Sequence, residues 1–363
     1  MATGEERHVF PAVRGLQAGR EYYVAMCRLR RLPKLLRFHD QELEPELRAQ
    51  RRLNKGRLPE MSRYVLENPE SYTFSALTAS IDGDLKFTPS EKGPAGHLGE
   101  LVVPESAKVI LNDGQHRRAA IEMALEKNPE LGEETIAVVF FHDRGLDRCQ
   151  QMFSDLNRYA IRPSTSLGIL YDHRDEKSEL IRRVVLQSEV FGDLVETERS
   201  ALSRGSRALF TLSALYRATS ELLKGRDEEP LSDRIRSALG FWEEVATHLP
   251  EWGLVREREM TSGEVRTKFL HSHAIVLNAL GRSGNTLLAE SAAWRGPLKR
   301  LRSIDWSRSN TEQWEGRAMI GGRVSKSGNS VTLTSNVIKQ VLGLPLTSSE
   351  QRVEDAYLQR PHA

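Results

Sequence analysis

Short runs of β-branched, aromatic and aliphatic residues, separated by turn residues, characterise the chain up to about residue 143. Runs of this kind predict strands. The predicted strands span residues 22–26, 72–80, 85–88, 101–103, 108–111 and 135–141. Residues 1–20 carry few apolar side chains among Gly, Glu and Arg, which predicts a flexible N-terminus.

The stretch 108–125 changes its period from that of a strand to that of a helix. Residues 109–111 are aliphatic, whereas alanines and a methionine recur at helical spacing over residues 119–124. Asp113 suits the N-cap of this helix, and Gly114 permits a sharp backbone turn. The pattern predicts a strand, a tight turn and a helix that begins directly after the glycine.

The first turn of the predicted helix has the composition of an anion site. Its amide groups point outward, and Arg117 and Arg118 put positive charge where the helix dipole disfavours it. A nucleotide phosphate there would meet the amides and Arg117, while Gln115 or His116 would orient a water molecule. Asp113 is a candidate magnesium ligand, although capping its own helix is the commoner role. The alternative to this catalytic set, Asp113, Gln115, His116 and Arg117, is a group of solvated arginines and a structural histidine.

Helical periodicity dominates from residue 146 onward. The predicted helices span residues 146–157, 180–190, 208–223, 235–249 and 268–280. The five tryptophans are predicted to close the helical core rather than to stack on bases; they are Trp242, Trp252, Trp294, Trp306 and Trp314. The change of period divides the chain into an α/β domain at residues 21–143 and a helical domain at residues 144–315.

Residues 316–363 form a third segment with a different character. The segment begins with a glycine pair at residues 321–322, and polar and apolar residues alternate over residues 330–333, which predicts a hairpin. A helix is predicted at residues 336–342, followed by a tail.

The composition is that of an ordinary globular protein, with 39% hydrophobic and 28% charged residues among 363. The longest apolar run, residues 136–141, is too short for a bilayer, and residues 1–20 lack the apolar region of a secretory signal. Two cysteines, Cys27 and Cys149, do not form a disulfide framework and fit a reducing compartment. A cytoplasmic protein without a membrane partner is therefore predicted. Cys27 is either a redox-sensitive thiol beside basic residues or, more commonly, a small buried hydrophobe.

The formal net charge is only +2, so any nucleic-acid surface requires an uneven distribution of charge. Such a stretch lies between residues 28 and 57. The candidate DNA-contacting residues are Arg28, Arg30, Arg31, Lys34, Arg48, Arg51, Arg52, Lys55 and Arg57. A solvated helical face is the alternative interpretation of the same residues.

No standard metal or nucleophile motif is present. His271 and His273 would point in different directions from a helix, so a zinc site is not predicted. The chain contains neither a Gly-x-Ser-x-Gly elbow nor a Gly-x-x-x-x-Gly-Lys phosphate loop.

Residues 113–117, Asp-Gly-Gln-His-Arg, spell the signature of the DGQHR-domain family, and the resemblance extends well beyond them. Further similar blocks lie at residues 68–79, 153–158, 171–175 and 209–215. Within the family the chain resembles the DndB group of DNA sulfur-modification proteins. This resemblance implies a bacterial DNA-binding protein that represses the operon for DNA phosphorothioation.

The same resemblance implies double-stranded DNA at the promoter of that operon as the partner, with other phosphorothioation proteins as further partners. Binding as a homo-oligomer fits a palindromic site. Two other classes of function stay open. One is an enzyme, either an NTPase that powers modification or a DNA-nicking protein, and the other is a non-catalytic adaptor of the modification complex.

Residues 114–117 also resemble the phosphate-binding turn of the ParB and sulfiredoxin superfamily. Gly114 and Arg117 match the ParB pattern, whereas Gln115 replaces the Glu of ParB proteins and the catalytic Cys of sulfiredoxins. The resemblance implies an α+β protein, with a small ParB/sulfiredoxin-like α/β domain ahead of a mostly α-helical one. It also implies a nucleotide-phosphate site at Gly114, Arg117 and Arg118. The downstream Arg of the ParB pattern falls out of register here, at Arg118 or Ala119, so CTP is not implied. The candidate cofactor is ATP or another NTP with magnesium, and the alternative is no cofactor. Asn157 and Arg158, at the end of a predicted helix, either complete this site or cap that helix.

Overall fold

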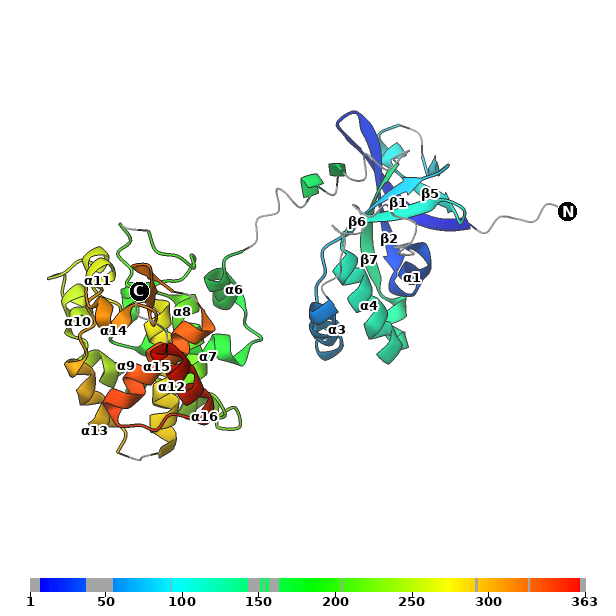
Figure 1. The fold of residues 1–363 in the computed structure, drawn as a ribbon. Helices are drawn as coiled ribbons and strands as arrows, with labels where there is room; N and C mark the ends of the chain where they lie inside the picture. The colour runs from blue at the N-terminus through cyan, green and yellow to red at the C-terminus, as the bar shows by residue number, and fades with distance from the viewer. Residues whose placement is uncertain are drawn as a thin grey trace. The chain divides into compact units, whose positions relative to one another are not determined.

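The computed structural model describes residues 7–36, 55–91, 93–142, 151–152, 154–156, 163–203, 205–290, 293–325 and 327–359. The chain divides into two compact units, residues 1–161 (unit 1) and residues 162–363 (unit 2). Each unit has its own hydrophobic core. Strands dominate unit 1 and helices dominate unit 2 (Figure 1), which confirms the predicted α+β class.

A seven-stranded mixed sheet forms the centre of unit 1. Its strands are β1 (Arg7–Gln17), β2 (Arg20–Arg28), β3 (Leu77–Asp82), β4 (Lys86–Pro89), β5 (Leu98–Pro104), β6 (Lys108–Asp113) and β7 (Thr135–His142). They lie in the order β4-β5-β1-β2-β7-β3-β6, and every neighbouring pair is antiparallel except β3 with β7. The two strands that flank the central helix in sequence, β6 and β7, are therefore separated by β3 and run antiparallel to each other.

Side-chain alternation decides which face of each strand enters the core. In β2, Tyr23, Ala25 and Cys27 are buried, whereas Met26 and Arg28 are exposed. All six predicted strands are present in the sheet, with shifted boundaries.

The prediction of a flexible N-terminus is wrong for residues 7–17, which form β1. Phe10 and Ala12 are buried, and β1 pairs with both β2 and β5. The sequence does not predict this strand because its few apolar residues are buried only by pairing with β2 and β5. Strand β5 lies far along the chain.

Three helices of unit 1 are α1 (Leu32–Leu35), α3 (Leu58–Glu67) and α4 (Gln115–Lys127), and both α1 and α3 pack against α4. Helix α4 buries Ala120, Ile121 and Ala124. Val65 of α3 joins Ala124 and Leu131 in a small separate cluster. The small side chains of α4 thus let its neighbours approach closely.

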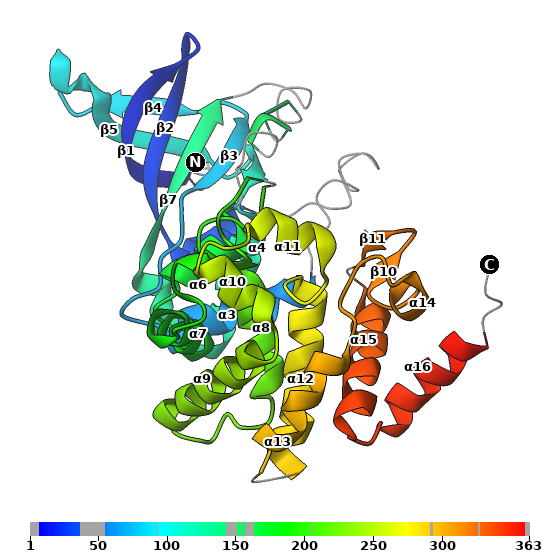
Figure 2. The same ribbon diagram turned by 90° about the vertical axis from the view of Figure 1, so that its left-hand side faces the viewer.

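Unit 2 is built almost entirely from helices. They are α6 (Thr165–Tyr171), α7 (Glu176–Gln187), α8 (Leu212–Leu222), α9 (Leu231–Thr247), α10 (Pro250–Arg256), α11 (Ser262–Lys268), α12 (Ala274–Glu290), α13 (Arg295–Leu298), α14 (Thr311–Trp314), α15 (Gly328–Leu342) and α16 (Ser348–Leu358). Two short strand pairs accompany them, β8 (Val195–Glu196) with β9 (Phe210–Thr211) and β10 (Met319–Ile320) with β11 (Arg323–Val324). Helix α12 packs against both α8 and α15 (Figure 2).

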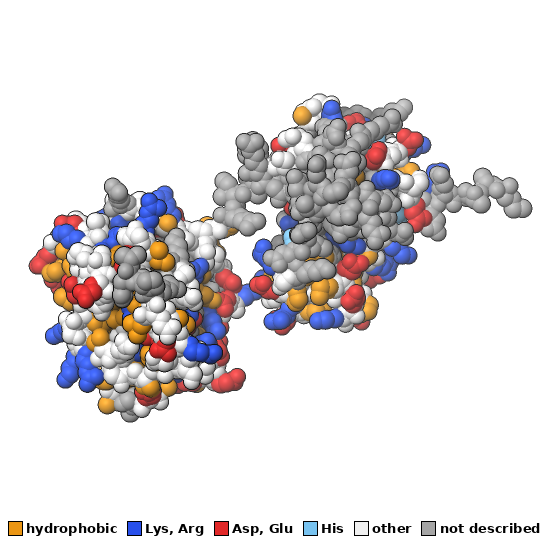
Figure 3. Space-filling view, in the orientation of Figure 1, with side chains coloured by type: hydrophobic (Ala, Val, Ile, Leu, Met, Phe, Trp, Pro, Cys, Tyr) orange, Lys and Arg blue, Asp and Glu red, His pale blue; other side chains and the backbone are white. Residues whose placement is uncertain are grey.

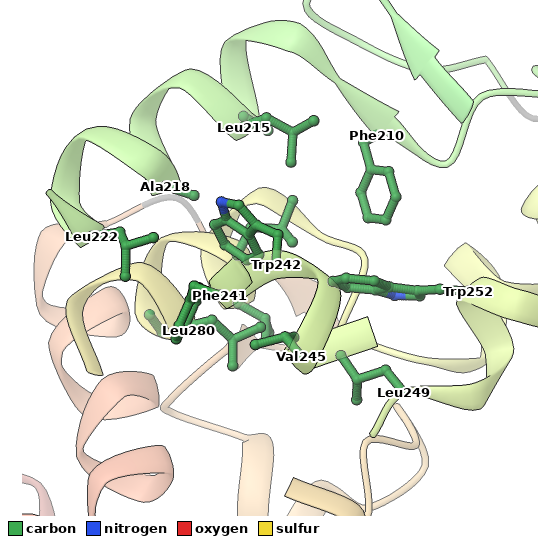
Figure 4. Close-up of a cluster of buried hydrophobic side chains, with 14 of the residues drawn as sticks. Phe210, Leu215, Ala218, Leu222, Phe241, Trp242, Val245, Leu249, Trp252 and Leu280 are labelled. Atoms are coloured by element: carbon green, nitrogen blue, oxygen red, sulfur yellow. The ribbon is translucent and has the colours of Figure 1, made fainter. Parts of the chain in front are cut away.

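Aromatic side chains fill the core of unit 2. Leu215 and Leu222 of α8 pack beside Phe241 and Trp242 of α9 (Figure 4), and the Trp242 indole donates to Oγ1 of Thr219 at 3.0 Å. Trp252, Trp306 and Trp314 are buried in the same core, and Trp294 is half-buried against it. The structural role predicted for the tryptophans is confirmed. Helix α12 approaches α8 closely because Gly281 has no side chain; a Cβ there would lie 2.1 Å from the carbonyl oxygen of Ala218.

The hairpin predicted at residues 330–333 is wrong, because these residues belong to α15. Leu333 and Val337, and likewise Ile338 and Leu342, are buried and four residues apart, and this helical pattern outweighs a four-residue alternation. The hairpin of this segment is formed instead by β10 and β11, around the predicted glycine pair. The predicted tail contains α16, which begins with a capping box between Thr347 and Glu350.

Candidate functional site

The motif at residues 113–117 lies at the junction of β6 and α4. Strand β6 ends at Asp113, Gly114 is left-handed with φ 101° and ψ 17°, and α4 begins at Gln115. Gly114 is itself the N-cap residue, and no side chain caps the helix. The N-cap role predicted for Asp113 is therefore wrong, because its carboxylate bonds to Arg117 instead.

Space as well as backbone conformation requires glycine at position 114. A Cβ atom there would lie 2.4 Å from Cδ2 of Leu77 and 3.0 Å from Nη2 of Arg117. Leu77 is the first residue of β3 and is fully buried. Side chains of unit 1 therefore fill the space against this turn.

Arg117 fastens three segments of unit 1 together. Its Nη2 lies 2.5 Å from Oδ2 of Asp113 and 3.2 Å from the carbonyl oxygen of Ala76, and its Nη1 donates to Oγ of Ser75 at 2.8 Å. Only 20% of the Arg117 side chain is exposed. The guanidinium thus ties the chain ahead of β3 to the junction of β6 and α4.

The protein's own carboxylates balance the two arginines at the start of α4. Asp113 pairs with Arg117, and Glu122 pairs with Arg118 at 3.3 Å, one turn further along the helix. The positive charge that the helix dipole disfavours therefore has internal counter-ions.

Gln115 and His116 have different surroundings. The Gln115 side chain donates to the carbonyl oxygens of Leu111 at 3.0 Å and Asn112 at 3.2 Å. These bonds satisfy carbonyl groups near the C-terminal end of β6. His116 is half-buried, and burial, followed by the positive charge of Arg57, lowers its pKa. The imidazole is therefore neutral at pH 7 and can accept a proton.

This arrangement determines how an anion can bind at the turn. The first amides of α4 precede the first helical hydrogen bond, which runs from the amide of Arg118 to the carbonyl of Gly114 at 2.9 Å. A phosphate approaching these amides would compete with Asp113 for Arg117. Of the other proposed phosphate ligands, Asn157 and Arg158 lie outside the described residues.

The described part of the basic stretch follows β2 into the short 3-10 helix η1 (Leu29–Arg31) and then into α1. Arg28 and Arg30 both pair with Glu133, and the Arg28 contact is 2.7 Å long. This neutralisation is not visible in the sequence, because Glu133 lies 105 residues after Arg28 and only the fold brings them together.

The remaining cations of the stretch differ from this pair. Arg31 and Lys34 are exposed and form no ion pair with any described residue. Arg57 is exposed near His116. Basic and acidic side chains are interspersed over the face of unit 2 that Figure 3 shows. Arg48, Arg51 and Arg52, and the side chain of Lys55, lie outside the described residues.

Cys27 is fully buried in the sheet core. Burial raises the pKa of its thiol to about 12, and the nearby charge of Arg31 opposes this only weakly. The alternative of a thiol with a lowered pKa is therefore wrong, and Cys27 is a buried hydrophobic residue. Within the described ranges, no group of three or more His, Cys, Asp or Glu side chains is arranged to hold a metal ion.

Comparison with known proteins identifies the family to which the chain belongs. No curated protein matches the chain. No solved structure matches it either, so the likeness to ParB and sulfiredoxin proteins stays a prediction. No helix in the described part of the chain combines the length and apolar character needed to cross a membrane. A family model, DndB, described as DNA-sulfur modification-associated, matches residues 10–345, a range that includes the junction at residues 113–117. The resemblance seen in the sequence is confirmed, and the chain belongs to the DndB family of DNA-sulfur modification-associated proteins.

Proposed function

We propose that this protein binds double-stranded DNA and represses the operon that encodes DNA sulfur-modification enzymes. The observation that carries the proposal is the family match over residues 10–345, which connects the chain to DNA sulfur modification. The more specific role as a repressor comes from the resemblance to the DndB group.

Arg31 and Lys34 support contact with DNA. They belong to η1 and α1. Leu29, Leu32 and Leu35 of these helices are buried in the sheet core, so the backbone that carries the two cations is held in place. Exposed Lys and Arg side chains that contact phosphates provide most sequence-independent affinity for DNA. Arg28 and Arg30 contribute less while both are paired with Glu133.

Binding of the full-length protein to a labelled promoter duplex tests the proposal, with a shuffled duplex of the same length as the control. We expect affinity to fall steeply with salt, and the promoter to bind about 1,000-fold or more tightly than the shuffled duplex. Equal binding to both duplexes would favour the adaptor, and nicking of a supercoiled plasmid would favour the enzyme.

A triple variant locates the contact surface. Arg31→Ala/Lys34→Ala/Arg57→Ala should weaken binding to both duplexes and reduce the salt slope by up to about 3, because each lost phosphate contact lowers it by about 0.9. The matched control is Lys177→Ala/Arg183→Ala/Arg236→Ala in unit 2. It removes the same number of positive charges from exposed, ion-paired positions and should bind like the parent.

Within the same proposal, a nucleotide phosphate at residues 113–118 acts as a switch for DNA binding. The amides at the start of α4 and the neutral imidazole of His116 support it. The phosphate would compete with Asp113 for Arg117, so we expect binding to loosen this junction. Titration with ATP and magnesium, followed by phosphate release from the parent and from Asp113→Ala, separates binding from hydrolysis. Unchanged nucleotide affinity in Arg117→Ala would contradict the switch.

A further inference from the structure

Unit 2 contains a cavity of about 520 Å³ between the corner joining α9 to α10 and the chain at residues 301–306. Much of its wall is apolar and includes Leu249, Phe269, Ile304 and Trp306. A volume of several hundred Å³ with a few polar groups in an apolar wall is typical of a small-molecule site. The polar groups of the wall decide which ligand fits.

The first polar group is Glu251, whose carboxylate lies beside the buried side chains of Trp252 and His271. The indole Nε1 of the buried Trp252 donates to Nδ1 of His271 at 3.0 Å, so any proton on this ring sits on Nε2. That Nε2 lies 3.2 Å from Oε2 of Glu251, and the His271 side chain is 0% exposed. The contact with His271, against the effect of burial, lowers the pKa of Glu251. Glu251 therefore presents an ionised carboxylate to the cavity.

The second polar group is His248, which also lines the cavity. Its Nε2 lies 3.1 Å from Oε1 of Glu244, a carboxylate that only accepts hydrogen bonds, so Nε2 carries the proton. Its Nδ1 is buried and has no hydrogen-bond partner among the described residues, while only 9% of the side chain is exposed. Because Nδ1 is buried, it does not face the cavity, and His248 contributes the shape of its ring to the wall rather than a hydrogen bond to a ligand.

The third polar group is Arg302 at the rim. One of its Nη groups donates to the carbonyl oxygen of Thr247 at 2.8 Å, which leaves further N–H donors of the guanidinium for a ligand. The wall therefore offers two carboxylates as acceptors, Glu251 and the exposed Asp305, together with the guanidinium of Arg302 as a donor.

We propose that this cavity binds a guanine base, with the Glu251 carboxylate accepting from its N1–H and N2 amino groups. Guanine has flat apolar faces for the aromatic wall, a donor edge for Glu251, and the O6 and N7 acceptors that Arg side chains commonly meet. Adenine lacks the N1–H donor. A guanidinium ligand would satisfy Glu251 but would have no acceptor for Arg302.

The base comes from a free guanine nucleotide or from single-stranded DNA. In a duplex the N1–H and N2 amino groups are occupied by cytosine, so only an unpaired or extruded guanine offers this edge. This inference does not depend on the proposed repressor function, which concerns duplex DNA and residues of unit 1.

Calorimetric titration of the full-length protein with GMP, IMP and AMP tests the inference. We expect GMP to bind at least about 10-fold more tightly than AMP, with IMP between them because it keeps N1–H and loses the amino group. Short thymidine oligonucleotides with a single central dG or dA form the second arm. Binding of GMP indicates a free nucleotide as the source, whereas binding of the dG oligonucleotide alone indicates single-stranded DNA.

Two variants and a control place the ligand in this cavity. Glu251→Gln keeps the shape of the side chain and should weaken guanine binding at least about 10-fold, because the amide cannot accept from both donors. Arg302→Ala, at an exposed position, should weaken binding several-fold and provides the answer if Glu251→Gln does not fold. Glu257→Gln changes an exposed residue at the C-terminal end of α10, the helix that contains Glu251, and this variant should bind like the parent.

Several results would overturn the inference. They are the absence of binding for both GMP and the dG oligonucleotide, equal affinity for GMP and AMP, tighter binding of agmatine than of GMP, and unchanged affinity in both variants. Arg31→Ala/Lys34→Ala/Arg57→Ala should retain guanine binding. Failure of duplex binding and failure of guanine binding are therefore distinguishable.

Discussion

Asp113 and Arg117 form an ion pair across the glycine turn between β6 and α4, with 2.5 Å between Oδ2 and Nη2. The same guanidinium holds Ser75 and Ala76. Arg117, the predicted phosphate ligand, therefore also stabilises the fold of unit 1. An anion at Arg117 would therefore compete with contacts that stabilise the fold.

Removal of the Arg117 guanidinium should therefore destabilise the protein. Arg117→Ala leaves Asp113 and the carbonyl of Ala76 without their partner, and we expect the free energy of unfolding to fall by about 1–3 kcal/mol. Urea unfolding followed by circular dichroism measures this. Arg183→Ala, which removes an exposed arginine paired with Glu179, should change the stability by less than about 0.5 kcal/mol. A fully stable Arg117→Ala protein would show that the guanidinium is free for a ligand.

Gly114 should tolerate substitution much less than another left-handed glycine of the same unit. Gly114→Ala combines strained backbone with a clash against Leu77, and should cost about 2–4 kcal/mol. Gly19, in the turn between β1 and β2, has φ +73°, and a Cβ added there would meet no atom within 4 Å beyond its chain neighbours. Gly19→Ala should therefore cost only about 1 kcal/mol, from backbone strain alone. Comparable losses in the two variants would contradict the packing described around Gly114.

Glu133 should restrain DNA binding by the basic stretch. Glu133→Ala releases Arg28 and Arg30 from their shared carboxylate, so we expect duplex affinity to rise several-fold at low salt and the salt slope to steepen by up to about 2. Fluorescence anisotropy with the promoter duplex measures both quantities. Glu130→Ala, an exposed residue of the 3-10 helix η4 (Pro129–Glu133) that also contains Glu133, controls for the change in net charge. An equal rise in both variants would point to overall charge, and no rise in either would move the contact surface elsewhere.

Glu354 should anchor α16 to the rest of unit 2. Its carboxylate contacts Arg317 at 2.5 and 3.0 Å and accepts from Asn336 at 2.9 Å, and only 4% of the side chain is exposed. Glu354→Ala leaves a largely buried guanidinium unpaired and should cost about 3–5 kcal/mol in urea unfolding. Asp355→Ala, at the next and exposed position, should change stability by less than about 0.5 kcal/mol. A small loss for Glu354→Ala would mean that water reaches Arg317 when the carboxylate is removed.

Cys27 should resist thiol reagents in the folded protein. Burial raises its pKa to about 12, so the thiolate is scarce near pH 8 and reagents also lack access to it. We expect reaction only after unfolding in urea, with reactivity growing as pH approaches the ordinary thiol pKa of about 8.5. Peptide mapping follows Cys27 separately from Cys149. Rapid modification of Cys27 without unfolding would restore the redox-sensor alternative.

Local sequence patterns predicted the structure correctly where that structure depends on neighbouring residues. The switch from aliphatic residues at 109–111 to small residues at helical spacing predicted the junction of β6 and α4, because strand and helix periods are properties of neighbouring residues. The structural role of the tryptophans followed in the same way. The prediction was wrong where a short pattern fits both the strand period and the helix period, as at residues 330–333 in α15.

The sequence by itself therefore determined the α+β class, the strand-turn-helix junction and, through its motif blocks, the family. Tertiary structure decided how the charges are used. Arg117 is held by Ser75 and Ala76, Arg28 by Glu133, and Glu251 by His271, all residues that lie elsewhere in sequence. The partners of Arg28 and Glu251 lie near them only in the packed fold, so no local pattern could identify these two charges as paired, whereas the pair of Arg118 and Glu122 has ordinary helical spacing.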